Sequence, residues 1–71
     1  MPGGGPVGHG RATAEEVGKG DHAAGFLLAL KRALDNLDGN TFGGQTLHLV
    51  AKAEISRNPG GINGYIIEFT T

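Results

Sequence analysis

Residues 21–39 read DHAAGFLLALKRALDNLDG, and this stretch decides the fold. Its large apolar residues recur at the three- and four-residue spacing that places them on one broad face of an α-helix. Those residues are Phe26, Leu27, Leu30, Ala33, Leu34 and Leu37. Asp21 is a good N-cap because its carboxylate can accept from first-turn amides, and Gly39 can end the helix in a left-handed conformation. We therefore predict a helix over residues 21–38.

An alternating stretch follows the expected helix and predicts a β-strand over residues 47–56. The side chains that share its inner face are Leu47, Leu49, Ala51, Ala53 and Ile55. Residues 58–61 read NPGG, a turn sequence, and residues 62–71 predict a second strand antiparallel to the first. The large residues on the inner face of that second strand are Tyr65, Ile67 and Phe69.

The pairing of these two strands can be predicted from their faces. A five-residue loop that pairs Arg57 with Asn63 sets apolar residues opposite one another, whereas a loop one residue shorter mixes core with solvent. The pairs that this register predicts are Ile55 with Tyr65, Ala53 with Ile67, Ala51 with Phe69, and Lys52 with Glu68. The last of these is a favourable cross-strand ion pair. We expect residues 62–71 to form an open edge of the sheet.

The first twenty residues are less decisive. Glycine and proline dominate residues 1–10, which predicts a flexible arm outside the core. Residues 13–16 read TAEE, which matches a capping box and favours a short helix. An extended edge strand over residues 10–17 is the alternative, because tertiary pairing could override the local preference. Residues 11–71 are expected to form a single domain.

The expected fold class is α+β, with one amphipathic helix packed on a two- or three-stranded antiparallel sheet in the order (β)-α-β-β. Seventy-one residues without cysteine form a small core that no disulfide can reinforce. We therefore expect a homo-oligomer, in which copies of the chain complete the core. Four apolar side chains that lie off the packed faces are the expected contacts: Ala24, Leu28, Val50 and Ile66.

Composition and motif spacing exclude several functions. A net charge of −1 argues against binding to nucleic acid, and no apolar stretch approaches the roughly 20 residues of a membrane span. The sequence shows no signal peptide and no cysteine, which favours a cytoplasmic protein. The three histidines lack metal-ligand spacing, and no nucleophile has an identifiable base. We expect neither a metal site nor an enzyme.

One short segment has the composition of an anion site. Gly18, Lys19 and Gly20 precede the expected helix, where free amides and the positive end of the helix dipole attract anions. They lack the spacing of a phosphate-binding loop. A flexible hinge followed by a helix cap is the alternative interpretation.

Several segments together resemble the dodecins, a family of small proteins with a strand, a helix and two long antiparallel strands. The similar segments are residues 17–24 (VGKGDHAA), 29–34 (ALKRAL), 37–39 (LDG) and 61–65 (GINGY). The resemblance implies a hollow homododecamer that wraps helices in sheet and stores a flavin or a related ligand. The tryptophan that stacks on the flavin in that family, and a glutamine on the last strand, have no counterpart here. The identity of a cofactor therefore stays open.

The sequence supports two hypotheses of different classes. The first is a non-catalytic, dodecin-like homo-oligomer that encloses a small ligand, with Phe42, His48 and Tyr65 as candidate ligand-binding residues. The second is a structural subunit or interaction module, in which the N-terminal arm and the open edge strand contact neighbouring proteins. Deletion of residues 1–10 should leave the first kind of assembly intact and break the second.

Overall fold

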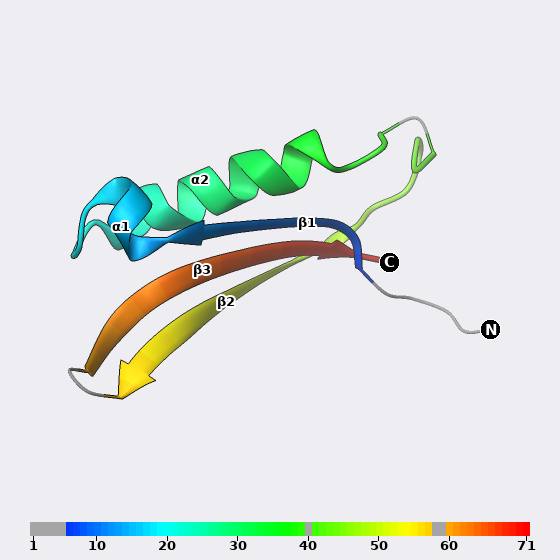
Figure 1. Cartoon of the computed structure of the whole chain (residues 1–71). Helices are drawn as coiled ribbons and strands as arrows, with labels where there is room; N and C mark the ends of the chain where they lie inside the picture. Colours follow the sequence, from blue (N-terminus) through cyan, green and yellow to red (C-terminus); the bar gives the residue numbers. More distant parts are fainter. Residues whose placement is uncertain (1–5, 40, 58–59) are drawn as a thin grey trace.

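The computed structural model describes residues 6–39, 41–57 and 60–71. In chain order the elements are β1 (Pro6–Thr13), α1 (Ala14–Val17), α2 (His22–Asp35), β2 (His48–Arg57) and β3 (Gly60–Thr70). The strands form an antiparallel sheet in the order β1-β3-β2, and α2 lies across one face of it (Figure 1). This arrangement confirms the predicted α+β class and the order of strand, helix and two strands.

The N-terminal segment combines the two structures that its sequence left open. β1 pairs with β3 as far as Thr13, and one turn of helix then begins at Ala14. The Glu16 carboxylate accepts from the Thr13 backbone amide at 2.9 Å, as the capping box predicts, and also from the Thr13 hydroxyl at 3.3 Å. The prediction of an arm was wrong for residues 6–10, because they belong to β1. Residues 1–5 lie outside the described part of the chain.

The predicted start of the helix is confirmed, and its predicted end at residue 38 is wrong. The Asp21 side chain accepts from the Ala24 amide at 3.3 Å, so it is the N-cap. The helix then ends at Asp35 rather than at residue 38. The Asn36 amide donates to the carbonyls of the preceding turn, which tightens the last turn and satisfies them without a left-handed residue. The predicted left-handed terminator, Gly39, has no positive φ.

The predicted register between β2 and β3 was wrong by two residues, although the faces were right. Ala53 lies opposite Tyr65, Ala51 opposite Ile67 and Leu49 opposite Phe69. The cause is a tighter hairpin, in which Arg57 pairs with Gly60 rather than with Asn63. A bulge follows it: Glu54 pairs with Gly64 and Ile55 with Ile62, so Asn63 is an extra residue in β3. The bulge restores Ile62 to the inner face, where it packs against the core. The predicted ion pair still forms diagonally, with 3.2 Å between Lys52 Nζ and Glu68 Oε1.

The prediction that residues 62–71 form an open edge was also wrong. β3 is the central strand, because β1 from the N-terminus pairs with its other side. The edges of the described sheet are therefore β1 and β2.

The predicted stripe of α2 is right for Ala33, which is buried, and for Phe26 and Leu30, which pack against the core, but its most buried line consists of small residues. Gly25, Ala29 and Ala33 recur every four residues and are buried, whereas Leu27 and Leu34 are 64% and 52% exposed. The helix lies so close to β1 that a Cβ at Gly10 would sit 2.1 Å from the carbonyl oxygen of Ala29. Large side chains cannot occupy a contact of this kind. The buried core is accordingly compact and consists of Ala12, Ala14, Ala29, Ala33, Tyr65 and Ile67.

The helix covers the sheet unevenly. α2 packs on β1 and β3, while β2 makes its main contacts with β3 alone (Figure 1). Two large inner-side residues of β2 remain open to solvent: Leu49 is 54% exposed and Ile55 is 65% exposed. Ala51 and Ala53 between them are exposed as well. The inner face of β2 is thus an apolar surface with no cover in the described chain.

Candidate functional site

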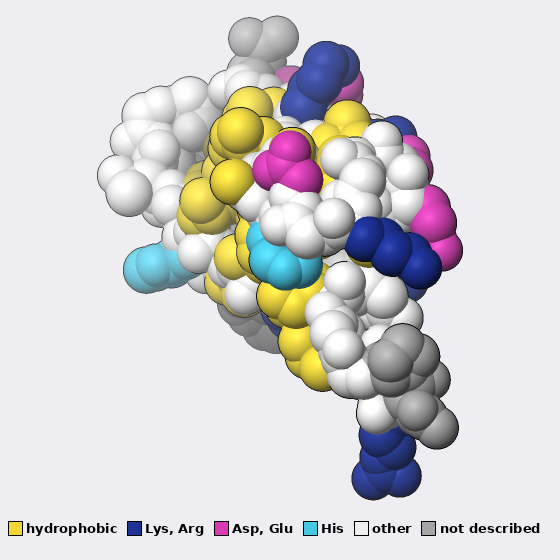
Figure 2. Space-filling model, turned by 90° about the vertical axis from the view of Figure 1, so that its left-hand side faces the viewer, with side chains coloured by type: hydrophobic (Ala, Val, Ile, Leu, Met, Phe, Trp, Pro, Cys, Tyr) yellow, Lys and Arg dark blue, Asp and Glu magenta, His cyan; other side chains and the backbone are white. Residues whose placement is uncertain are grey.

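A pocket of about 360 Å³ opens at the end of the molecule where the α1–α2 loop faces the β2–β3 hairpin. Ala14, Lys19 and His22 line it from the helical side. Ser56, Ile62 and Asn63 line it from the strands. Figure 2 views the molecule from this end and shows a histidine at the surface beside a strip of hydrophobic side chains. The volume lies at the lower end of the range for small-molecule pockets.

Glycines shape the loop on the helical side of this pocket. Gly18 and Gly20 have φ of 92° and 95°, a region that L side chains rarely adopt. The Asp21 amide donates to the Gly18 carbonyl at 3.2 Å, which closes the loop just before α2. Of the three residues predicted as an anion site, Lys19 and Gly20 line the pocket and Gly18 does not.

The pocket has a mixed electrostatic character. Lys19 contributes a positive charge and Glu15 a negative one, while Ser56 and Asn63 contribute neutral polar groups. Ala14 and Ile62 supply apolar surface between them. Such a lining suits a small ligand that has both polar groups and an apolar body.

His22 links the pocket to the core, and sequence reasoning missed this role. Its Nδ1 lies 2.9 Å from the hydroxyl of Tyr65, which is completely buried. The Tyr65 ring packs edge-on against Phe26, with 4.9 Å between the ring centroids, and fits where Gly25 has no side chain. A phenol buried in a small core needs a hydrogen-bond partner. The signal in the sequence was the position of His22 directly after the N-cap Asp21, in the first turn of the predicted helix.

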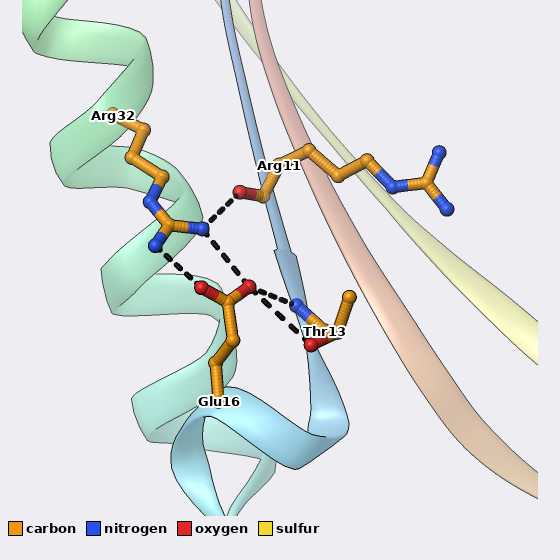
Figure 3. A network of polar contacts seen from close by, with 4 residues as sticks. All are labelled: Arg11, Thr13, Glu16 and Arg32. Atoms are coloured by element: carbon orange, nitrogen blue, oxygen red, sulfur yellow. Dashed lines mark hydrogen bonds and ion pairs between the residues drawn. The ribbon is translucent and has the colours of Figure 1, made fainter.

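A polar network next to the pocket ties three elements together (Figure 3). The Arg32 guanidinium donates to both carboxylate oxygens of Glu16, at 3.0 and 2.5 Å, and to the backbone carbonyl of Arg11 at 2.7 Å. The Arg32 hydrogen bond and the Thr13 backbone amide lower the pKa of Glu16 to about 2. The same pairing raises the pKa of Arg32. Glu16 therefore stays ionised in moderately acidic solution and holds α1 against α2 and β1.

Side chains of α2 also occupy part of the outer edge of β1. Arg32 donates to the carbonyl of Arg11, and Asn36 Nδ2 donates to the carbonyl of His9 at 2.7 Å. These carbonyls are two residues apart in the strand, and their partners are four residues apart in the helix. β1 is consequently an edge strand that the protein's own helix partly protects.

The three predicted ligand-binding residues do not meet within one chain. Tyr65 is a buried core residue in β3, whereas Phe42 lies half-buried in the turn before β2. His48 is exposed at the first position of β2, five residues before Ala53, which pairs with Tyr65. Five strand residues span about 17 Å. Only Tyr65 approaches the pocket, and it does so through His22.

The four predicted oligomer contacts are all partly buried within the single chain. Ala24 and Leu28 lie on α2, and Leu28 packs against the core. Val50 and Ile66 lie on the outer face of the sheet, on β2 and β3. The large apolar side chains that are most exposed are instead Leu27, Leu34, Leu49 and Ile55. Sequence periodicity missed these four, because it placed them in the core.

Two further properties concern the described residues only. No group of three or more histidine, aspartate or glutamate side chains gathers there in a way that could hold a metal ion. No helix in this part of the chain is long and apolar enough to cross a membrane.

Together the fold and the pocket define a class of protein: a small α+β chain with one long helix on an open antiparallel sheet and a pocket of about 360 Å³ at one end. Comparison of the chain with family models, with curated protein sequences and with solved structures gives no match.

Proposed function

We propose that the protein is a non-enzymatic, homo-oligomeric protein that binds or stores a small ligand, similar in kind to the dodecins. The observation that carries the proposal is the uncovered inner face of β2, with Leu49 and Ile55 more than half exposed. Copies of the chain are the partners that would cover it. The strand–helix–strand–strand order, with two long final strands, supports the resemblance noted in the sequence.

The surface area of the chain supports the need for partners. The single chain exposes 4609 Å². A compact monomer of 7.3 kDa is expected to expose about 4,200 Å². The radius of gyration is 13.6 Å, against about 11 Å for a compact domain of 71 residues. A thin, extended chain of this kind gains stability when copies bury its open faces.

The pocket between the α1–α2 loop and the hairpin supports the ligand-binding part of the proposal. It offers Lys19 and Glu15 as opposite charges beside apolar surface. A flavin is the ligand that the resemblance implies, and the missing tryptophan leaves its identity open. The cytoplasmic location expected from the sequence stays a prediction.

Native mass spectrometry of protein purified from its own host tests the proposal. We expect an assembly of several chains and a retained small molecule, whose mass would identify it. A single chain without bound ligand would contradict both parts of the proposal.

The alternative, a structural subunit or interaction module, is favoured by one observation: β2 is an edge strand of the described sheet and makes its main contacts with β3. Deletion of residues 1–10 no longer separates the two hypotheses, because residues 6–10 form part of β1. Deletion of residues 2–5 is the better test. A self-assembling ligand-binding protein should keep its stoichiometry after this deletion, whereas an assembly held together by the arm should dissociate.

A further inference from the structure

We propose that two copies of the chain pair antiparallel through their β2 edges, about a two-fold axis at Ala53, and so form a continuous six-stranded sheet. This inference rests on the self-association proposed above and specifies its interface. It follows from the state of the sheet edges, the charges on β2 and the residue at the axis.

The three described strands differ in how far their outer edges are already occupied. β3 is central, so it offers no edge. The outer carbonyls of His9 and Arg11 in β1 already accept hydrogen bonds from Asn36, the C-cap of α2, and from Arg32 of α2. β2 makes its main element contacts with β3 alone. Among the strands that the structure describes, β2 therefore has the edge best able to add another strand.

A second copy of the chain is the partner that fits the β2 edge. Antiparallel pairing of two identical strands about an axis perpendicular to the sheet keeps both inner faces on the same side. The exposed apolar faces of the two β2 strands would then lie next to each other, between the two helices. A second copy thus extends the same apolar surface, and each β2 strand supplies the neighbouring strand that the other β2 edge lacks.

The charges of Lys52 and Glu54 fix the register of the two β2 strands. With the axis at Ala53, Lys52 lies opposite Glu54 of the second copy, and the reverse pair forms as well. An axis at Lys52 or at Glu54 would instead place like charges opposite each other, which is destabilising. In each chain Glu54 already pairs with Arg11, and Lys52 with Glu68. The outer face of the dimer would therefore carry one continuous row of alternating charges.

The inner face agrees with this register. Ala53 lies opposite Ala53 of the second copy at the axis, where two small methyl groups can lie side by side on the inner face. Ala51 lies opposite Ile55 of the second copy, so a small residue accommodates a large one that is 65% exposed in the single chain. An axis at Ala51 is the neighbouring register without like-charge contacts, but it leaves Lys52 opposite Val50.

Cysteine cross-linking tests the proposal cleanly, because the chain contains no native cysteine. Directly opposite residues in an antiparallel pair have Cα atoms about 4.5–5.5 Å apart, within the range that a disulfide spans. Under mild oxidation at low protein concentration, Ala53→Cys should give mostly covalent dimer. Lys31→Cys on exposed α2 and Ala51→Cys are the matched controls and should stay monomeric on denaturing gels. A mixture of Ala51→Cys and Ile55→Cys chains should form the mixed dimer.

Native mass spectrometry of the unmodified chain separates failure of this interface from failure of the proposed function. If the chain self-associates but Ala53→Cys links no faster than Lys31→Cys, the interface is wrong and the proposed function stands. If Ala51→Cys links with itself faster than Ala53→Cys, the axis lies at Ala51 and the register is wrong. A chain that stays single in native spectra and in cross-linking overturns both. Circular dichroism of each variant confirms that the fold is retained.

A charge swap gives an independent readout of the register. Lys52→Glu should weaken dimer formation at least tenfold, because it sets two glutamates opposite each other at two places. The double variant Lys52→Glu/Glu54→Lys restores opposite charges across the axis. Because it also sets like charges beside Arg11 and Glu68 within each chain, we expect it to recover part of the affinity that Lys52→Glu loses. Recovery no greater than that of the single variant would contradict the proposed register.

Discussion

Gly10 is the residue at which the backbones of β1 and α2 lie in close contact. A Cβ there would lie 2.1 Å from the Ala29 carbonyl oxygen and 2.3 Å from the Ala33 amide nitrogen. Both are backbone atoms of α2, so the clash can be relieved only by moving the helix away from β1. The absence of a side chain at this position thus fixes the spacing between two elements.

We therefore expect Gly10→Ala to lower the free energy of unfolding by about 3 kcal/mol or more, as severe overpacking does. Urea unfolding followed by circular dichroism measures the loss. Gly39→Ala is the matched control, because no atom lies within 4 Å of a Cβ at that position and its φ is not positive. Equal unfolding midpoints for the two variants would show that the close contact does not exist.

The hydrogen bond between Tyr65 and His22 supports a second prediction at this scale. Tyr65→Phe removes only the hydroxyl and should cost about 1 kcal/mol of stability, the usual net value of one hydrogen bond. His22→Ala should cost less in the Tyr65→Phe background than in the native chain, because the partner is already gone. A double-mutant cycle measured in urea gives the coupling energy. Strictly additive effects would contradict a direct bond between the two side chains.

At the scale of elements, Glu16 and Arg32 hold α1, α2 and β1 together. The pKa of Glu16 is about 2, below its usual 4.5. The folded state therefore binds this proton less readily than the unfolded state does. The resulting stability is fully present above about pH 4.5 and is lost as the pH falls from there towards 2. Both side chains are substantially exposed, so the contribution should weaken at high salt.

Glu16→Gln should accordingly flatten the decline of stability between pH 4.5 and 2. Urea midpoints measured across this range for the native and variant chains provide the test. Glu15→Gln is the matched control, since Glu15 is the neighbouring carboxylate and lies outside the network. If both variants follow the native pH profile, the pairing of Glu16 with Arg32 is not stabilising.

The elements could be predicted from sequence wherever a local signal decides them. The Asp21 cap, the capping box at Thr13 and the alternation in the last two strands all gave the right structure. The register was missed because the hairpin pairs Arg57 with Gly60, more tightly than the predicted loop allows. The bulge at Asn63 was missed as well, because it depends on the packing of Ile62 against the core. The buried helix face was predicted only in part, because Gly25 and Ala29 were missed. Hydrophobic periodicity selects leucines for the buried face of the helix, whereas the close contact between α2 and β1 requires small side chains there.

At the scale of the whole molecule, the inner face of β2 has no cover in the described part of the chain. The candidate pocket could be anticipated only in part: the Gly-Lys-Gly segment pointed to the α1–α2 loop, but its other wall comes from the hairpin. Residues so far apart in the chain are brought together by the strand order, which the sequence did not reveal. The proposed assembly follows from the same strand order, since it leaves β2 at the edge.

The uncovered face supports one prediction about assembly. Leu49→Ser should weaken self-association while leaving the fold of the single chain nearly unchanged, because Leu49 is 54% exposed in that chain. Leu27→Ser, at a helix residue of similar exposure, serves as the control for a general loss of surface hydrophobicity. The two variants are compared by the concentration at which half of the protein is associated. An equal effect of both substitutions would argue against β2 as the interface.

Sedimentation velocity over a dilution series tests the central claim most directly, namely that copies of the chain complete the sheet face that α2 leaves bare. We expect an assembly of at least two chains at micromolar concentration, which dissociates on dilution together with a loss of stability. A single 7.3 kDa species that sediments unchanged and unfolds cooperatively at every concentration would contradict it.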